Sequence, residues 1–362
     1  ASITLPASGS YYQTMLKEKG ILDSIAFQQI APFGLGDIEV EIDVKAAGLN
    51  FKDVLNLNGL LTEESVIGGL VGAQLGLECS GVVSKVGKSV THVQPGDRVI
   101  AFSPNSFAGK VVTPKHCVVK LPDHISFEEG ATITLVYLTA YHCMFNLGQM
   151  DEGERLLIHS ATGGVGMAAV ALAQLRGIEI FATAGTEKKR ELLRKMGVKN
   201  VYNSRTIEFH DEIMRDTNGE GVDLVLNSLS GKAIIQSIKC LRPFGRFVEI
   251  GKTDIYNDMS LQLKRFGDNL SYFAVDIDRL MAQRPKKAAI LFKDVIELFE
   301  SNDVEPHPFT SFKINEIRDA IDFIAKGKHI GKVVLSMEDQ EVTALPAAKL
   351  RFSDEKSYII TG

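Results

Sequence analysis

Apolar and polar residues alternate in short runs over the first third of the chain. Residues 38–44 alternate one by one, residues 81–86 are rich in β-branched side chains, and residues 96–100 have the pattern of a turn that enters a strand. Short strands separated by glycine and proline are typical of β-barrel domains. The pattern therefore predicts a barrel-like β-domain up to about residue 125.

From about residue 130 the pattern becomes one of alternating strands and helices. Residues 155–159 form an apolar strand, and the apolar residues after it recur at the i, i+3, i+4 spacing of a helix. That spacing is carried by Val165, Ala168, Ala169, Leu172 and Ala173. Further strands are predicted at 178–183, 222–227 and 246–250, with a helix through Leu192 and Leu193 and another that runs to Leu241. This alternation predicts a parallel, doubly wound sheet.

The C-terminal part predicts two more helices, at 287–300 and 316–326, and a last strand at 332–335. We expect these elements to return to the first domain and complete it. The length of 362 residues suits two domains, each large enough to bury its own core.

Composition and charge exclude several classes of protein. Hydrophobic residues make up 45% and charged residues 23% of the chain, as in soluble globular proteins, and no apolar run has the ~18 residues that a membrane helix needs. The balance of 40 Lys and Arg against 45 Asp and Glu leaves a net charge of −5, with no cationic stripe for a phosphate backbone. We therefore expect neither a membrane nor a nucleic acid as a partner.

The four cysteines are Cys79, Cys117, Cys143 and Cys240, and none has the C-x-x-C spacing of zinc or redox sites. We interpret them as scattered buried thiols. The N-terminus lacks a charged segment followed by an apolar one, so no secretory signal is visible and a cytoplasmic setting is expected. Because the first residue is Ala1 and the last is Gly362, we expect a fragment of a longer protein.

A glycine-rich turn, residues 161–166 (ATGGVG), lies between the predicted strand at 155–159 and the helix at 165. It matches G-x-G-x-x-G with alanine in the first place. Gly163 would let the backbone approach a pyrophosphate, and Gly166 would let the helix pack close to the strand. The helix N-terminus adds free N–H groups and a positive dipole end. In this context the turn predicts dinucleotide binding, with an ordinary tight turn as the alternative.

The end of the next strand indicates which dinucleotide binds. A carboxylate there would hold the ribose diol of NAD, whereas small residues leave space for a 2′-phosphate. Residues 182–185 (ATAG) are small, and Lys188 and Arg205 follow as two cations suited to a phosphate or, alternatively, as solvated surface charges. Glu187 stands near the expected position of the acid, but we interpret it as a first-turn helix residue after the cap Thr186. The prediction is NADPH rather than NADH.

Eight motifs resemble, in the expected order, the enoyl reductase domain of type I polyketide synthases and animal fatty acid synthases. They are 48–54 (GLNFKDV), 75–78 (LGLE), 95–99 (PGDRV), 138–141 (LTAY), the glycine-rich turn, 226–229 (LNSL), 251–254 (GKTD) and 329–334 (HIGKVV). The similarity runs from about residue 9 to 335. That domain belongs to the zinc-free branch of the medium-chain dehydrogenase/reductase superfamily.

The resemblance implies an α/β fold in which a Rossmann domain, residues 128–275, is inserted into a GroES-like β-barrel substrate domain. The substrate domain would be split between residues 1–127 and 276–340. Residues 341–362 would be a linker and, at 358–362 (YIITG), the first strand of a following ketoreductase domain.

The same resemblance implies NADPH-dependent reduction of the α,β double bond of an enoyl thioester, with hydride going to the β-carbon and a proton to the α-carbon. The substrate would be carried on the phosphopantetheine of an acyl carrier protein, beside neighbouring dehydratase and ketoreductase domains of the same synthase. One alternative is a free-standing zinc-free quinone or alkenal reductase. A second is a non-catalytic domain that binds NADPH and only spaces its neighbours.

Zinc-dependent members of the superfamily place a Cys ligand near Asn50 and a His just before Glu78, and this chain has neither, so no metal is expected. Lys252 follows a Rossmann strand and is the candidate proton donor or enolate stabiliser, unless it only contacts the cofactor or caps the turn. Its acidic partner is either Asp276 or Asp278, with Asp276 slightly preferred. Many modular polyketide enoyl reductases have a Tyr where this chain has Leu61, so a phenol cannot be the donor here.

The predicted cofactor site draws on both domains. Its residues are Asn50, Thr139, Thr162, Gly163, Gly164, Val165, Gly166, Thr183, Lys188, Ser204, Arg205, Asn227, Ser228, Leu229, Gly251, Lys252, Gly331 and Lys332. Asn50, Lys52 and Asp53 are expected to line the nicotinamide pocket, although Lys52 and Asp53 could instead pair with each other.

Overall fold

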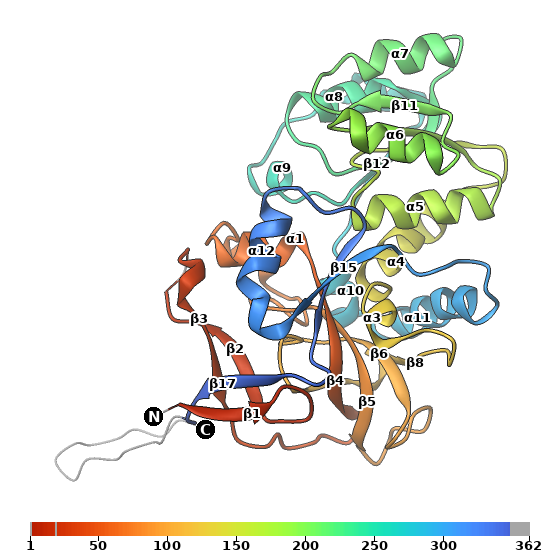
Figure 1. The fold of residues 1–362 in the computed structure, drawn as a ribbon. Helices are drawn as coiled ribbons and strands as arrows, with labels where there is room; N and C mark the ends of the chain where they lie inside the picture. Colours follow the sequence, from red (N-terminus) through yellow and green to blue (C-terminus); the bar gives the residue numbers. More distant parts are fainter. Residues whose placement is uncertain (1, 19, 348–362) are drawn as a thin grey trace.

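The computed structural model describes residues 2–18 and 20–347. They form two lobes (Figure 1). The middle of the chain, drawn in yellow-green to cyan, makes the upper lobe, whereas the red N-terminal and blue C-terminal segments meet in the lower lobe. Segments from both ends of the chain therefore build one lobe, and the middle of the chain builds the other.

The upper lobe contains a six-stranded sheet in the order β11-β10-β9-β12-β13-β14, with every neighbouring pair parallel. The strands are β9 (Arg155–Ile158), β10 (Glu179–Ala184), β11 (Asn200–Asn203), β12 (Val222–Asn227), β13 (Leu241–Glu249) and β14 (Ser271–Ala274). Counted from β9, the order is 3-2-1-4-5-6, as in dinucleotide-binding Rossmann folds. The predicted parallel, doubly wound sheet is confirmed.

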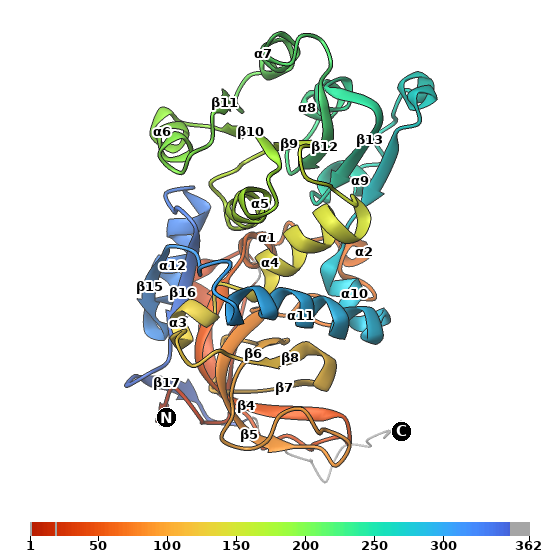
Figure 2. The same ribbon diagram turned by 90° about the vertical axis from the view of Figure 1, so that its right-hand side faces the viewer.

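Helices cover both faces of this sheet (Figure 2). They are α5 (Gly164–Leu175) and α6 (Glu187–Lys195) on one face and α7 (Phe209–Asp216) and α8 (Lys232–Lys239) on the other. The prediction that the last of these helices runs to Leu241 is wrong. Leu241 is buried as the first residue of β13, paired with Val222, so the helix ends before it.

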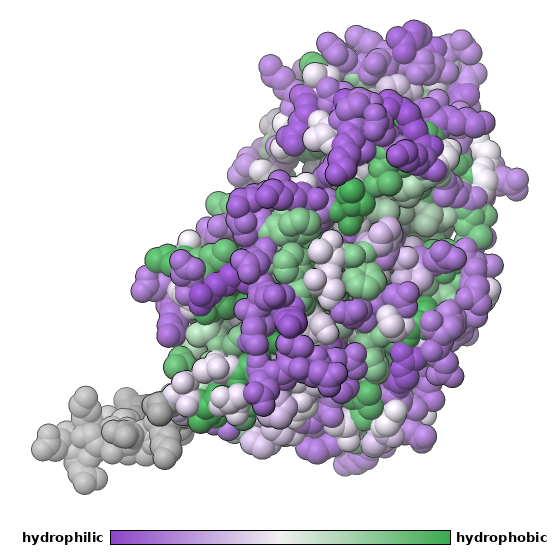
Figure 3. All heavy atoms as spheres, viewed as in Figure 1, coloured by the Kyte–Doolittle hydropathy of each residue, from purple (hydrophilic) through white to green (hydrophobic). Residues whose placement is uncertain are grey.

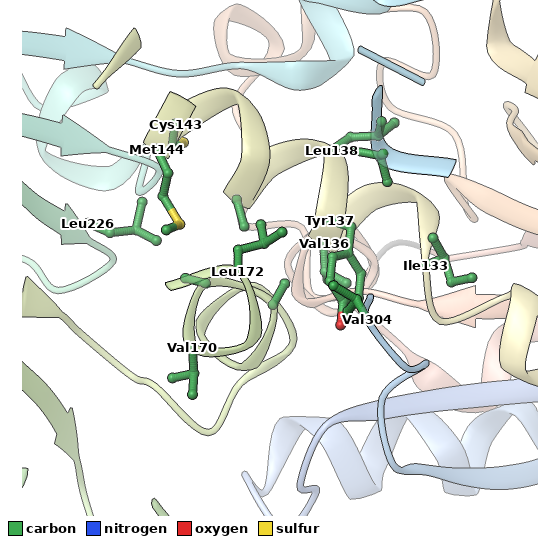
Figure 4. Packing of buried hydrophobic residues seen from close by; sticks show 14 of the residues in the cluster. Ile133, Val136, Tyr137, Leu138, Cys143, Met144, Val170, Leu172, Leu226 and Val304 are labelled. Atoms are coloured by element: carbon green, nitrogen blue, oxygen red, sulfur yellow. The ribbon is translucent and has the colours of Figure 1, made fainter. Parts of the chain in front are cut away.

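Strand β9 contributes side chains to two hydrophobic clusters, because successive side chains of a strand point to opposite faces of the sheet. Leu156 and Ile158 join a cluster with α4 (Thr134–Tyr141) and α5, whereas Leu157 joins a second cluster with Phe181 and Phe247. Figure 4 shows part of the first cluster, where Val136 and Tyr137 of α4 lie near Leu172 of α5. Helix α4 continues into the π-helix η3 (His142–Leu147).

The lower lobe has a larger, mainly antiparallel sheet in the order β15-β16-β4-β5-β6-β8, with β7 paired to β4. Its strands are β4 (Glu39–Leu49), β5 (Glu78–Val86), β6 (Arg98–Phe102), β7 (Lys110–Pro114), β8 (Val118–Lys120), β15 (Phe309–Lys313) and β16 (Lys332–Ser336). Strand β16 pairs antiparallel with β4 along Val333–Leu49 to Ser336–Ala46. The C-terminal segment thus completes the N-terminal sheet, as expected for the split fold.

A further sheet of the order β1-β17-β3-β2 corrects the predicted linker. Its strands are β1 (Ile3–Pro6), β2 (Tyr12–Leu16), β3 (Ile25–Gln29) and β17 (Glu341–Leu345). In β17, Val342 and Ala344 are buried while the residues between them are exposed, so the strand belongs to this lobe. A linker can begin only after Leu345, and the predicted ketoreductase strand at 358–362 lies outside the described residues.

Shorter elements and helices connect these sheets. They are η1 (Leu22–Ser24), α1 (Phe51–Leu57), α2 (Glu63–Val66), η2 (Lys115–Cys117), α3 (Phe127–Gly130), α9 (Thr253–Tyr256), η4 (Leu263–Asp268), α10 (Ile277–Gln283), α11 (Pro285–Glu300), η5 (Ile314–Glu316) and α12 (Ile317–Ala325). Helix α11 packs against both α4 and η2, and α12 packs against α1 and β16. None of the helices within residues 2–18 and 20–347 is long and apolar enough to cross a membrane. All four cysteines are buried free thiols, as predicted.

His159, directly after β9, connects three elements of the upper lobe from a buried position. Its Nδ1 lies 2.9 Å from the Thr183 hydroxyl on β10, and its Nε2 lies 2.7 Å from the Ser237 hydroxyl on α8. Burial lowers the pKa of His159 to about 3, so the folded protein keeps this ring neutral.

His159 should make the fold sensitive to acid. Below pH 6.5, the ordinary pKa of histidine, His159 binds a proton in the unfolded chain but not in the folded chain. The free energy of unfolding therefore decreases as the pH falls toward 3. Near pH 5 this loss is about 2 kcal/mol. Urea unfolding of His159→Gln, followed by circular dichroism at pH 7 and pH 5, should show a pH-dependent loss smaller by about that amount. The exposed His124→Gln is the control, and an equal loss in His159→Gln and wild type would contradict the account.

Candidate active site at the carboxyl edge of the parallel sheet

A cavity of about 680 Å³ lies between the lobes, at the carboxyl ends of the parallel strands. The upper lobe contributes the turns after β9, β10, β11, β12 and β13, and the lower lobe contributes residues from the end of β4 and from α12 to β16. In the space-filling view, the surface between the lobes carries apolar and weakly polar side chains, whereas the upper lobe is mostly hydrophilic (Figure 3). Ligands of open α/β sheets bind at this edge.

The glycine-rich turn has the geometry that its sequence predicts. A Cβ on Gly166 would lie 2.6 Å from the Ala161 Cα, so only glycine lets α5 approach the end of β9 this closely. At Gly163 a Cβ would meet only the Ser160 carbonyl oxygen, at 3.3 Å, and the backbone is open toward the cavity. Among the described residues no side chain caps α5, which leaves its first N–H groups for an anion.

Two cations follow β10 and β11 at the cavity, and one of them is not the residue that the sequence predicts. Arg205 and Lys189 line the cavity together with Ser204, whereas the predicted Lys188 is exposed. The Arg205 side chain lies over Gly185, where a Cβ would come within 2.7 Å of its Nε. Burial, followed by the charge of Arg205, lowers the pKa of Lys189. Two cations held this close to each other suit a dianionic ligand group.

Glu187 lies in the first turn of α6, as its sequence context predicts. Thr186 caps the helix by accepting a hydrogen bond from the Lys189 N–H at 3.3 Å. The Glu187 carboxylate forms ion pairs with Arg190 and Arg194, each at 2.7 Å. Both of its oxygens are therefore engaged within α6.

Most of the predicted cofactor residues come together at the cavity. Those that line it are Asn50, Thr162, Gly163, Gly164, Val165, Gly166, Ser204, Arg205, Ser228, Leu229, Gly331 and Lys332. Of the rest, Thr139, Thr183 and Asn227 are buried behind the lining, Gly251 and Lys252 are half-buried, and Lys188 is exposed.

Several lining residues were not predicted as site residues from the sequence, and Phe51 and His329 are two of them. Phe51 lines the cavity although most of its side chain is exposed, and His329 lines it although most of the ring is covered. The Nδ1 atom of His329 is buried without a hydrogen-bond partner among the described residues. An orphaned polar atom beside the open backbone of the glycine turn fits a polar ligand in this cavity. The position of His329 in the HIGKVV motif was the available signal.

A buried ion pair forms the cavity wall in the lower lobe. Lys332 is 3% exposed, and its ammonium group pairs with the fully buried Glu78 and donates to the Asn50 Oδ1 at 2.7 Å. The Asn50 Nδ2 donates in turn to a Glu78 oxygen at 2.9 Å, and the other Glu78 oxygen accepts from the Leu135 N–H at 2.7 Å. Both the oxygen and the nitrogen of the Asn50 amide are thus hydrogen-bonded, so this side chain has a structural role in the cavity wall.

The candidate catalytic residues fall into two separate ion pairs. The Lys252 Nζ lies 2.6 Å from an Asp276 oxygen, and the Lys52 Nζ lies 2.7 Å from an Asp278 oxygen. Asp278 also accepts from the Val71 and Gly72 N–H groups, so it anchors α10 to the loop before β5. Asp276, and not Asp278, is the acid that contacts Lys252.

Lys52 and Asp53 do not pair with each other. Lys52 contacts Asp278, while Asp53 is buried and accepts from the Asn50 and Gly76 N–H groups at 2.9 and 2.8 Å. Burial raises the pKa of Asp53 to about 6. Of the three residues expected around the nicotinamide, only Asn50 lines the cavity. In the described part of the chain, no group of three or more His, Cys, Asp and Glu side chains could hold a metal ion.

Comparisons with known proteins agree with this architecture. Residues 36–147 match the family model of the alcohol dehydrogenase GroES-like domain, and residues 164–274 match that of the zinc-binding dehydrogenases. The two models therefore divide between the N-terminal part of the lower lobe and the parallel sheet.

Relatives place the chain more narrowly. It is 40% identical over 361 residues to a phenolphthiocerol/phthiocerol polyketide synthase of Mycobacterium tuberculosis, and the match covers 98% of this chain but 16% of that protein. Among solved structures, CurK enoyl reductase is 39% identical with a TM-score of 0.82, covering 90% of this chain and 98% of that one. The CurF ER cyclopropanase from the curacin A pathway is 34% identical with the same TM-score and coverage.

The order of strands, the glycine turn and the relatives point to one family. The match to CurK enoyl reductase extends over nearly the whole of that chain, and the match to the mycobacterial synthase extends over nearly the whole of this one. The chain therefore belongs to the enoyl reductase domains of polyketide synthases, which are oxidoreductases of the medium-chain dehydrogenase/reductase superfamily.

Proposed function

We propose that the chain reduces the α,β double bond of an enoyl thioester with NADPH. The observation that carries the proposal is the Lys252–Asp276 ion pair, whose two residues follow β13 and β14 at the sheet edge where the cavity lies. A proton source beside a hydride source is what reduction of a conjugated double bond requires.

The cavity residues fit a dinucleotide with a 2′-phosphate. The open backbone of residues 163–166 would hold the pyrophosphate, and Ser204, Arg205 and Lys189 would hold the 2′-phosphate. Glu187, the acid that could have favoured NADH, is engaged by Arg190 and Arg194. When bound, NADPH supplies the hydride for the β-carbon.

Lys252 supplies the proton for the α-carbon or stabilises the negative oxygen of the thioester before that proton arrives. Its ammonium group is held by Asp276 and by the Ser65 carbonyl oxygen at 3.3 Å, and Asp276 is itself fixed by the Arg279 N–H at 3.2 Å. Because the Lys252 side chain is 30% exposed, water can restore its proton after each turnover.

A carrier-bound substrate and neighbouring synthase domains form part of the proposal. The support is that the relatives are far longer, since the chain spans 16% of the mycobacterial synthase. We infer that the thioester arrives on the phosphopantetheine of an acyl carrier protein, with dehydratase and ketoreductase domains in the same chain. A free-standing quinone or alkenal reductase would instead turn over small enones without any dependence on pantetheine.

The first test is substrate turnover. Crotonyl-pantetheine added to the protein and NADPH should consume absorbance at the nicotinamide band, and NADH should be consumed much more slowly because it lacks the 2′-phosphate. Small enones without pantetheine serve as the comparison. Consumption of enones alone would favour the free-standing reductase, and no consumption with any enoyl thioester would refute the proposal.

The second test compares two adjacent lysines. Lys189→Ala should raise the KM for NADPH about 10- to 100-fold, because it removes a charged hydrogen bond worth about 1.5–3 kcal/mol. The KM for NADH should stay the same in this variant. Lys188→Ala is the matched control and should leave both values unchanged; the reverse pattern would show that Lys188 holds the phosphate.

The third test concerns Lys252. Lys252→Ala should lower kcat by about 10²-fold or more, as expected when a general acid is lost. The KM for NADPH should change by less than about threefold, since the residue acts in the transition state. Steady-state kinetics with crotonyl-pantetheine would measure both, and an unchanged kcat would reduce Lys252 to a scaffold residue.

A further inference from the structure

Glu249 is a buried acid that the proposed chemistry leaves unused. It is the last residue of β13 and is 2% exposed. Among the described residues no lysine or arginine forms an ion pair with it, and burial, with a contribution from Asp254, raises its pKa to about 7. A desolvated carboxyl group without a cation is costly, so its hydrogen bonds must account for its place in the fold.

The side chain of Glu249 connects two loops at the sheet edge. Its Oε1 accepts from the Gly251 N–H at 2.6 Å, and its Oε2 accepts from the Asn227 Nδ2 at 2.6 Å. The turn at Gly251 closes directly onto the carboxylate, since a Cβ there would lie 2.8 Å from the Glu249 Oε1. Lys252 follows this turn immediately.

The main chain of Glu249 reaches the other member of the ion pair. Its carbonyl oxygen accepts from the Val275 N–H at 2.9 Å, and Val275 directly precedes Asp276. The next residue, Ile250, donates its N–H to the Asn227 carbonyl oxygen at 3.0 Å, which adds a second link to the loop after β12. Lys252 and Asp276 are thus each one residue away from an atom that Glu249 binds.

We propose that Glu249 is a positioning residue that sets the geometry of the Lys252–Asp276 ion pair. Lysine has four side-chain torsions and Lys252 is partly exposed, so the position of the turn decides how well its ammonium group meets Asp276. This role rests on the proposed function, in which Lys252 serves the α-carbon.

The hydrogen-bond pattern provides a polarity test. Glu249 meets two donors, so Glu249→Gln must place its NH2 group against either Gly251 or Asn227. Adding Asn227→Asp places an acceptor opposite the NH2 group that Glu249→Gln introduces. The new carboxylate can still accept from the Leu229 N–H but loses the bond that the Asn227 Nδ2 donates to the Leu229 carbonyl oxygen at 2.8 Å, so the recovery is partial. The doubly substituted protein should therefore recover part of the original geometry.

The experiment uses Glu249→Gln, the double variant Asn227→Asp/Glu249→Gln, and Glu249→Gln in the Lys252→Ala background. Hydrogen exchange followed by mass spectrometry measures the protection of the backbone amides in residues 250–254 and 275–278. Steady-state kinetics with NADPH and crotonyl-pantetheine measures kcat. Glu41→Gln is the control for loss of a buried acid, since Glu41 lies on β4 and bonds Ser84 and Tyr11.

Glu249→Gln should lose exchange protection in residues 250–254, because its side chain bonds the Gly251 N–H, and should lower kcat about tenfold or more, because small misplacements of catalytic groups are costly. Residues 275–278 should keep their protection, because Val275 is bonded by the main chain of residue 249, which the substitution leaves in place. The double variant should recover part of the lost protection and part of kcat, and in the Lys252→Ala background Glu249→Gln should lower kcat no further. Unchanged protection of residues 250–254, or an equal fall in kcat in both backgrounds, would overturn the positioning role. If wild type reduces no enoyl thioester, the proposed function fails, while hydrogen exchange still decides whether the Glu249 side chain holds residues 250–254.

Discussion

All six strands of the upper sheet run in the same direction, so their carboxyl ends meet at a single edge, and the site depends on this constraint. Strand β9 ends at the glycine turn and β11 at Arg205. Strands β12, β13 and β14 end at Asn227, Glu249 and the segment before Asp276. Residues that are distant in sequence therefore become neighbours, and each is held by a hydrogen-bonded strand rather than by a free loop.

Lys332 joins the two parts of the lower lobe through its buried ammonium group and meets the edge of the upper sheet with its side-chain stem. A charge at 3% exposure is tolerated only when it is paired, and breaking such a pair costs about 3–5 kcal/mol. Lys332 lies on β16 and Glu78 on β5, so the pair joins a C-terminal strand to an N-terminal one. The Lys332 stem also lies against the start of α5, since a Cβ on Gly164 would come within 3.2 Å of its Cδ. One interaction thus links the split lobe to the dinucleotide turn.

The sequence predicted the elements that depend on a local pattern of residues. It predicted less well the contacts that depend on residues distant in the chain. The strands and the turn around Gly163 carry their own periodicity and spacing, and the resemblance placed Lys252. The sequence predicted Lys188 as a phosphate-binding cation, whereas Lys189 lines the cavity, because a one-residue step on a helix changes the face and only packing shows which face meets the cavity. Likewise, two aspartates in one short stretch could not be told apart until Asp276 was found against Lys252.

Two further features differ in how far the residues themselves indicate them. Glu249 stands between the apolar residues Val248 and Ile250 at the end of β13, and a carboxylate at the end of a buried strand calls for a specific partner. The alternation of Glu341–Leu345 is that of a half-buried strand, yet its partners β1 and β3 lie at the other end of the chain, where no local signal reaches.

In the proposed reaction, hydride reaches the β-carbon from the cofactor, while the α-carbon takes an exchangeable proton beside the Lys252–Asp276 ion pair. Reduction of crotonyl-pantetheine by NADPH in D2O, with the product analysed by NMR and mass spectrometry, tests this most directly. The account predicts one deuterium in the product, at the α-carbon, and none at the β-carbon. Deuterium at the β-carbon, or a product that carries none, would contradict it.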